Sequence, residues 1–144
     1  MTLIEAAPPA GMTEIRSWTV SSVDDVAFVR TELEFALEEA RRVEQRSADT
    51  EVGAVADRIV LVASELATNG VRHGGPPVVV RLLRGGGVTA VDVVDHNPDE
   101  PPVLITDRAR GGGFGLVLAR RACRSLGWFR ADADTKHVWA QFAV

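Results

Sequence analysis

The chain has 144 residues, of which 46% are hydrophobic and 25% are charged, and its formal net charge is −4. This balance is typical of a single folded domain and excludes a disordered chain. The acidic charge argues against a direct contact with nucleic acid, and no apolar run reaches the roughly 20 residues that span a bilayer. The single cysteine, Cys123, excludes an internal disulfide and a cysteine-built metal site. We therefore expect a cytoplasmic protein that binds neither membrane nor nucleic acid.

The first half of the chain predicts a tail, a strand and two helices. Residues 1–14 contain two prolines and a glycine without periodicity, so we expect a flexible tail followed by one folded domain at 15–144. Alternation predicts a strand at 15–20. Apolar residues spaced by three and four predict helices at about 26–40 and 54–72, with a linker at 47–53. The sequence Ser22-x-x-Asp25 resembles a capping box at the start of the first helix.

The second half predicts a hairpin, a third helix and two final strands. Two strand-like runs, Val78–Leu83 and Val88–Asp95, are joined by a short glycine-rich connection, which predicts an antiparallel hairpin. An irregular segment then leads to a helix expected at Gly115–Leu126, followed by strands at 128–131 and 137–144. This order predicts an α+β fold, an α/β sandwich in which helices cover one face of a mixed, mainly antiparallel sheet.

Three polar residues share one flank of the predicted helix 54–72. Glu65 and Asn69 are four residues apart, which places their side chains one above the other. A carboxylate there can accept a proton from an attacking hydroxyl, and an amide oxygen can bind Mg²⁺. His73, on the same flank, either contacts a phosphate or caps the helix. The spacing alone leaves open whether these are ordinary polar residues at the edge of the core.

Asp95 ends the second strand of the predicted hairpin. Alternation places it on the same face as Val91 and Val93, so we expect its carboxylate to point inward. A buried carboxylate needs a hydrogen-bond donor. The exocyclic amine of adenine and the backbone N–H groups of the following turn both remain candidates.

A glycine-rich segment precedes the third predicted helix. Four of the five residues 111–115 are glycine, which allows backbone N–H groups to approach a phosphate at the positive helix end. A flexible loop that starts a helix is the alternative. Arg108 and Arg110 lie just before it, and they either stay solvated or close over phosphates.

Taken together, these motifs resemble the GHKL (histidine kinase-like) ATPase superfamily. The run Glu65–Gly74, ELATNGVRHG, looks like the N box, Asp95 matches the aspartate of the G1 box, and Gly113–Leu116, GFGL, matches the G2 box. The chain length and the segments Leu126–Trp128 and Lys136–Trp139 look like the small stand-alone members. Those members are anti-sigma factors that are also serine kinases of anti-anti-sigma proteins.

The resemblance implies a Bergerat-type ATP-binding fold with ATP and Mg²⁺ as cofactors. Asn69 would hold Mg²⁺, Asp95 would bind the adenine amine, and Glu65 would be the general base that activates a serine of the partner. The nucleotide-binding residues expected from the three boxes are Asn69, His73, Asp95, Gly113, Gly115 and Leu116.

Two functions follow from this resemblance. The first is an ATP-binding anti-sigma regulatory factor that phosphorylates a serine of an anti-anti-sigma protein and sequesters a sigma factor, with a homodimer as an open alternative to a monomer. The second is a catalytically silent interaction module, because the G1 pattern Asp-x-Gly-x-Gly reads Asp95-His96-Asn97-Pro98-Asp99 here. His137 also stands where relatives often have a small hydroxyl residue. The catalytic half of a two-component system is disfavoured, since we see no helix pair with a phospho-accepting histidine.

Overall fold

The computed structural model describes residues 4–8, 10–43, 50–100, 102 and 115–143. In chain order the elements are β1 (Ile4–Glu5), β2 (Thr13–Val20), α1 (Val23–Val43), α2 (Thr50–His73), β3 (Val78–Gly85), β4 (Val88–Asp95), α3 (Gly115–Ala122), β5 (Ser125–Arg130) and β6 (Lys136–Ala143). The strands form one sheet in the order β1-β5-β6-β4-β3-β2.

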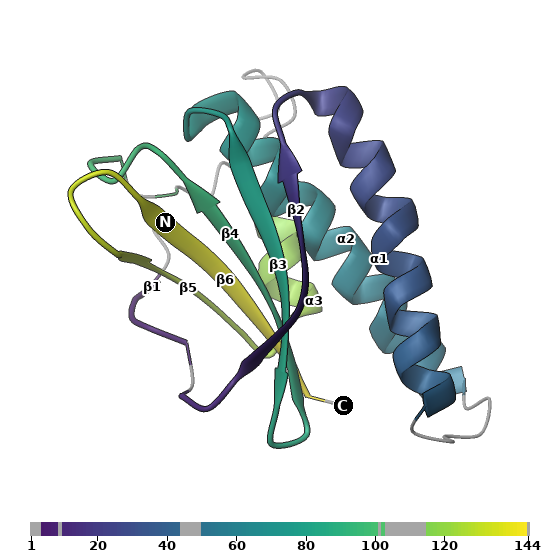
Figure 1. Cartoon of the computed structure of the whole chain (residues 1–144). Coiled ribbons are helices and arrows are strands. Elements are labelled where there is room, and N and C mark those ends of the chain that lie inside the picture. Colours follow the sequence, from purple (N-terminus) through teal and green to yellow (C-terminus); the bar gives the residue numbers. More distant parts are fainter. Residues whose placement is uncertain (1–3, 9, 44–49, 101, 103–114, 144) are drawn as a thin grey trace.

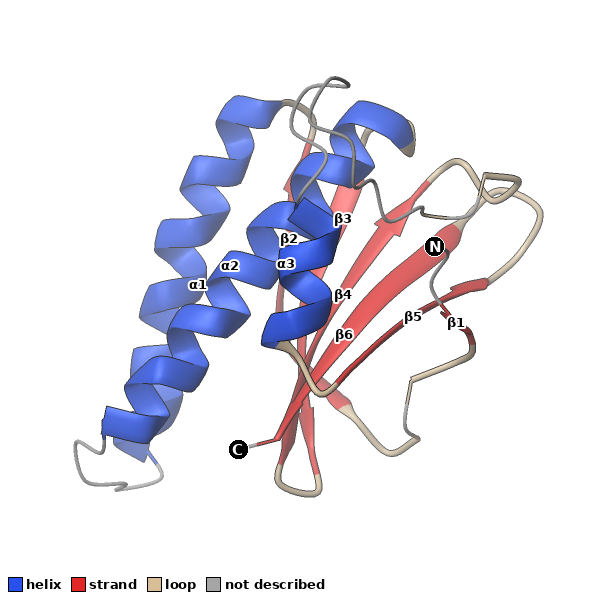
Figure 2. Cartoon of the chain, turned by 180° about the vertical axis from the view of Figure 1, so that it is seen from behind, coloured by secondary structure: helices blue, strands red, loops and turns tan. Residues whose placement is uncertain are grey.

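The helices of the described chain all lie on one face of this sheet (Figures 1 and 2). β1 pairs with β5 in parallel, whereas the other neighbouring strands pair antiparallel. This arrangement confirms the predicted α+β sandwich with a mixed, mainly antiparallel sheet. In the described residues we find no helix long and apolar enough to cross a membrane.

The start of α1 confirms the predicted cap. The Asp25 carboxylate accepts hydrogen bonds from the backbone N–H groups of Ser21 and Ser22 at 2.9 and 3.2 Å. The reach of the carboxylate back to the preceding residues satisfies donors that a helix start leaves free. α1 then runs beside α2, and together they form the outer layer on the helical face (Figure 1).

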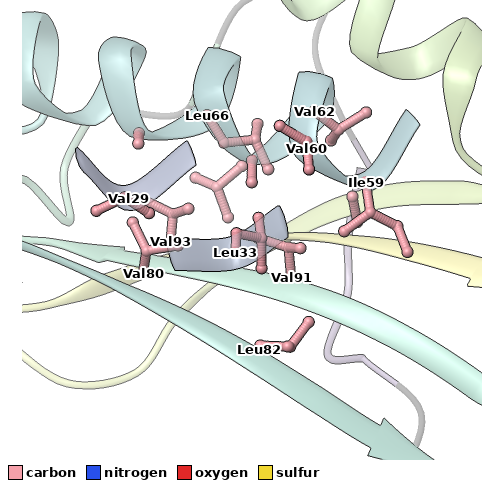
Figure 3. Packing of buried hydrophobic residues seen from close by; sticks show 14 of the residues in the cluster. Val29, Leu33, Ile59, Val60, Val62, Leu66, Val80, Leu82, Val91 and Val93 are labelled. Atoms are coloured by element: carbon pink, nitrogen blue, oxygen red, sulfur yellow. The ribbon is translucent and has the colours of Figure 1, made fainter. Parts of the chain in front are cut away.

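The core lies between this helical layer and the inner face of the sheet. Figure 3 shows side chains of α1 (Val29, Leu33), α2 (Leu66) and the strands (Val80, Val91) pointing toward one another. The face predicted for α2 is buried throughout: Ile59, Val62, Ala63, Leu66 and Gly70. Burial of these apolar surfaces drives the helices onto the sheet, because apolar area removed from water is the main favourable term in folding.

The β3–β4 hairpin brings the strand that carries Asp95 to the centre of the sheet. Its connection consists of Gly86 and Gly87, whose φ angles are +58° and +75°. Two consecutive residues with positive φ suit the right-handed twist of the flanking strands, and glycine adopts them without steric cost. The predicted hairpin is confirmed, with β4 over the expected residues.

Two predicted boundaries are wrong. α2 begins at Thr50, so part of the expected linker 47–53 is helical. Gly53 costs helix stability, but packing of a long amphipathic helix outweighs one glycine. α3 ends at Ala122 instead of Leu126, because Arg124 donates its backbone N–H to Gln141 at 2.8 Å and the chain has already joined β6. Leu126 is buried from a strand, a placement that its spacing could not distinguish from a helical one.

Part of the expected N-terminal tail lies on the sheet. Ile4–Glu5 form β1 opposite Gly127 and Trp128, and Ala6 continues the pairing with an N–H bond to Trp128 at 2.9 Å. The indole N–H of Trp139 donates to the Ala6 carbonyl at 2.7 Å. These bonds satisfy the otherwise free edge of β5, which explains why a segment without periodicity pairs there.

Candidate functional site

The polar residues of the N box lie along the second half of α2. Glu65 and Asn69 are half-buried one turn apart, and His73 is the exposed last residue of the helix. Between them, Gly70 faces the sheet so closely that a Cβ there would lie 3.2 Å from Val78 and 3.5 Å from Val93. The absence of a side chain at Gly70 therefore lets this end of α2 approach the end of β4.

Asp95 occupies that end of β4 on the helical face of the sheet. Its side chain is only 3% exposed, which confirms the predicted inward orientation. One carboxylate oxygen, Oδ1, accepts the backbone N–H of Asn97 at 3.0 Å, and the other, Oδ2, lies 3.5 Å from the ammonium nitrogen of Lys136. Burial raises the pKa of the Asp95 carboxyl above its usual value, while the Asn97 N–H and the Lys136 charge partly offset that shift.

Gly74 places the backbone after α2 directly against this carboxylate. A Cβ at this position would overlap the Asp95 carboxylate group. The Gly74 carbonyl accepts the backbone N–H of His96 at 2.9 Å, and its own N–H donates to Gly70 at 2.8 Å. The end of the N box is thus in direct contact with the aspartate of the G1 box and is hydrogen-bonded to the residue that follows it.

The loop after Asp95, residues 96–100, is held from three sides. Asn97 donates its side-chain amide to the His73 carbonyl of α2 at 3.2 Å and to the Glu100 carboxylate at 2.7 Å. Arg130 of β5 donates to the Pro98 carbonyl at 3.1 Å, and Lys136 of β6 donates to the Glu100 carbonyl. Asn97 stands where the G1 pattern has glycine, so its two side-chain hydrogen bonds are contacts that a glycine could not make.

The phosphate side of the predicted site is only partly described. Gly113, Arg108 and Arg110 lie outside the described residues, and of the G2 box the structure describes the backbone of Gly115 and Leu116 at the start of α3. α3 packs against α2 on the helical face (Figure 2). In the described ranges no group of three or more His, Cys, Asp or Glu side chains could hold a metal ion. The assignment of Mg²⁺ to Asn69 stays a prediction, in which one amide oxygen would act together with nucleotide phosphates.

Sequence reasoning missed two residues that contact the Asp95 carboxylate, Gly74 and Lys136. We call Asp95 with these two neighbours the Asp95 corner. The sequence indicates that Gly74 ends the N-box run, but no pattern predicts its contact with Asp95. Lys136 is the only lysine in the chain, yet its place opposite Asp95 follows from the register of β4 and β6. No local pattern predicts that pairing, because some 40 residues separate the two positions.

Comparison with known proteins identifies the family to which this chain belongs. Residues 20–142 match the family model of the histidine kinase-like ATPase domain. Because the match covers most of the chain, the protein belongs to this family, and the GHKL resemblance of its motifs is confirmed.

One curated relative is similar to part of the chain. The chain is 35% identical over 108 residues to the sensor protein CseC of Streptomyces avermitilis, and the match covers 61% of this chain and 21% of that protein. The chain thus spans about a fifth of the length of this curated relative.

Proposed function

We propose that this domain binds ATP with Mg²⁺ and acts as a serine kinase of the anti-sigma factor type. The observation that carries nucleotide binding is the buried Asp95 carboxylate between the ends of α2 and β4. A desolvated acceptor of this kind selects a ligand that brings its own N–H donors, such as the exocyclic amine of adenine. The Gly74 backbone lies directly against this carboxylate, so the end of the N-box run and the acceptor group are in contact.

The N-box residues of α2 supply the remaining groups. Asn69 offers an amide oxygen for Mg²⁺, and Glu65, one turn earlier on the helix, offers a carboxylate as general base. When bound, ATP supplies the phosphoryl group and Mg²⁺ neutralises phosphate charge. In phosphoryl transfer, positioning and charge neutralisation dominate, so few protein side chains are required.

The partner assignment rests on the likeness to small stand-alone members of the superfamily. The phosphate acceptor would be a serine of an anti-anti-sigma protein, and the sequestered partner would be a sigma factor. A histidine acceptor is the competing possibility, because the family model that matches the chain is that of the histidine kinase-like ATPase domain. A homodimer is the proposed assembly, to be measured by light scattering together with binding.

Calorimetric titration with Mg·ATP tests nucleotide binding. We expect saturable binding by the wild type and a loss of at least about tenfold in affinity for Asp95→Asn, because an amide accepts a weaker hydrogen bond than a carboxylate and presents a competing donor. Asp92→Asn is the matched control, since Asp92 is a buried aspartate of the same strand on the opposite face. Absence of binding at millimolar ATP, or equal affinities of Asp95→Asn and wild type, would refute the proposed site.

Phosphorylation of a purified anti-anti-sigma protein tests catalysis. Glu65→Ala is expected to bind Mg·ATP with wild-type affinity and to abolish formation of phosphoserine on the partner, as detected by mass spectrometry. Phosphotransfer at the normal rate by this variant would show that Glu65 is not the base. Phosphohistidine in place of phosphoserine would instead assign the domain to the sensor-kinase type.

The alternative function is a silent interaction module. It is favoured by the contacts that hold the loop 96–100 and by the position of Lys136 on Asp95. A module of this type would bind a sigma factor with the same affinity in the presence and absence of Mg·ATP, a comparison that calorimetry makes directly. Turnover of ATP into phosphoserine would exclude it.

A further inference from the structure

We propose that the ammonium group of Lys136 is a built-in competitor of the nucleotide base for Asp95. This inference rests on the proposed binding of ATP and goes beyond it, because it assigns the control of affinity to a residue of β6. Lys136 is the first residue of that strand and lies directly opposite Asp95 in the β4–β6 register.

The Lys136 ammonium lies beside Oδ2, the Asp95 oxygen that the Gly74 backbone also approaches closely. Oδ1 already accepts the Asn97 backbone N–H, which is part of the main chain and cannot be exchanged for a ligand without refolding the loop. Oδ2 lies 3.5 Å from the Lys136 ammonium, and the two side chains are 5% and 3% exposed. A carboxylate oxygen can accept two hydrogen bonds. In this buried position, however, the Lys136 ammonium and the Gly74 backbone both crowd Oδ2, so an amine that binds Oδ2 competes with the ammonium for the same space.

The competition is between two donors of the same chemical type. An exocyclic amine and an ammonium both donate N–H groups to a carboxylate, but the ammonium carries a full positive charge and its hydrogen bond is stronger. Lys136 also loses no translational entropy when it contacts Asp95, because it belongs to the same chain, whereas a free nucleotide does. While the Lys136 ammonium lies on Oδ2, the base cannot bind there. The apparent nucleotide affinity is therefore the intrinsic affinity multiplied by the fraction of molecules in which the ammonium has left Oδ2.

The Lys136 ammonium also connects Asp95 to the loop formed by residues 96–100. Its second partner is the Glu100 carbonyl, and the Glu100 carboxylate accepts from the Asn97 side chain, which in turn reaches the His73 carbonyl at the end of α2. Displacement of Lys136 therefore removes one of the contacts that hold residues 96–100. We infer that nucleotide entry and release of this loop are coupled through one side chain.

Replacement of the lysine tests the proposal by affinity. Lys136→Met keeps most of the buried aliphatic stem and removes the ammonium, and we expect it to bind Mg·ATP at least about tenfold more tightly than the wild type in calorimetry. The matched control is Arg130→Gln, which removes a cation that contacts the same loop through Pro98 and Asp99 but not Asp95. We expect this control to change the affinity by less than about twofold.

A second measurement reads the competition in the wild-type protein. Because the chain has one lysine, selective isotope labelling of lysine gives one side-chain NMR signal. We expect Mg·ATP to shift the Lys136 signal along the same saturation curve that calorimetry records. This readout needs no variant and decides the proposal even where Lys136→Met fails to fold.

The outcomes separate this inference from the proposed function. Equal affinities of Lys136→Met and wild type, or a Lys136 signal unmoved at saturating ATP, overturn the competitor role and leave nucleotide binding intact. Tighter binding by Arg130→Gln as well would assign the effect to loosening of the loop and would also overturn it. Absence of binding in the wild type and in both variants overturns the inference together with the proposed function.

Discussion

Two buried aspartates of β4, three residues apart, illustrate two uses of a desolvated carboxylate. Asp92 lies on the face of the sheet that the helices do not cover, where one of its oxygens lies 2.7 Å from Arg81 and 2.7 Å from His137. Asp95 lies on the helical face at the strand end, against Gly74 and Lys136. Both are almost fully removed from water, so burial by itself does not distinguish them.

The difference lies in where their partners come from. Arg81 is the register partner of Asp92 on β3, and it also binds Glu14 of β2 at 2.8 Å, a bond that raises the pKa of the guanidinium. We call Asp92, Arg81, Glu14 and His137 the Asp92 cluster. Its members belong to neighbouring strands of one sheet, so the cluster ties these strands together. Asp95 is instead bound by a backbone N–H of the following loop and by the buried Lys136 side chain of β6. A buried carboxylate at the end of its strand, held in part by a loop, is a better candidate for a ligand site than one held between strands inside the sheet.

The largest expected effect is on stability, at the Asp92 cluster. Asp92→Ala removes the carboxylate between Arg81 and His137, and we expect the free energy of unfolding to fall by about 2–3 kcal/mol in urea denaturation. The loss stays below that of a fully buried pair, because the Arg81 side chain is 31% exposed and can be hydrated. Glu14→Ala, which removes the more exposed partner of Arg81, should cost under about 1 kcal/mol. A cost of Asp92→Ala no greater than this control would contradict the interpretation.

The next prediction separates binding from stability at the Asp95 corner. Gly74→Ala introduces a Cβ that overlaps the Asp95 carboxylate, so we expect a loss of at least about tenfold in ATP affinity and about 1–2 kcal/mol in stability. Gly86→Ala is the control with a comparable backbone cost, because its φ is positive and the space around it is open. ATP affinity should be unchanged in Gly86→Ala. An equal loss of affinity in both variants would show that destabilisation alone accounts for the effect.

A pH comparison sharpens the contrast further. Because burial raises the native pKa of Asp95, its ionised form costs native stability at neutral pH, and the cost disappears as the pH falls through that pKa. The stability of the wild type relative to Asp95→Asn should therefore rise in urea denaturation as the pH falls from neutral toward the ordinary aspartate pKa of about 3.9. Over the same interval ATP affinity should fall, because protonation removes the acceptor. A relative stability that is constant or decreases toward acid would contradict this assignment.

The smallest effect is expected at the rim of the Asp92 cluster. His137→Gln removes the imidazole bonded to Asp92 and its stacking on Phe129, where the ring centroids are 4.6 Å apart. We expect a loss of about 1 kcal/mol in the free energy of unfolding and no change in ATP affinity, because His137 lies on the face opposite Asp95. A weaker ATP affinity in this variant would show that the two faces are coupled through β4.

Local sequence patterns determined the helical faces, the hairpin and the family of this protein. The apolar spacing of α2 predicted which of its side chains are buried, and the alternation of β4 predicted that Asp95 faces the helices, because periodicity decides which side of an element faces the core. Burial on the other face of β4, at Thr89 and Asp92, was not predicted by this alternation. The structure places the end of the N-box run, at Gly74, against the G1 aspartate.

Only the tertiary structure decided how distant segments meet. Nothing in residues 1–14 predicted that Ile4–Glu5 would pair with β5, and Leu126 had the spacing of a helix although it lies in a strand. The pairing of Lys136 with Asp95 likewise depends on the register of β4 against β6. Strand pairing is set by which edges remain free once the core has packed, a condition that involves the whole chain and leaves no local pattern. The sequence thus determined the motifs of the site, and the fold decided which residue stands against its buried carboxylate.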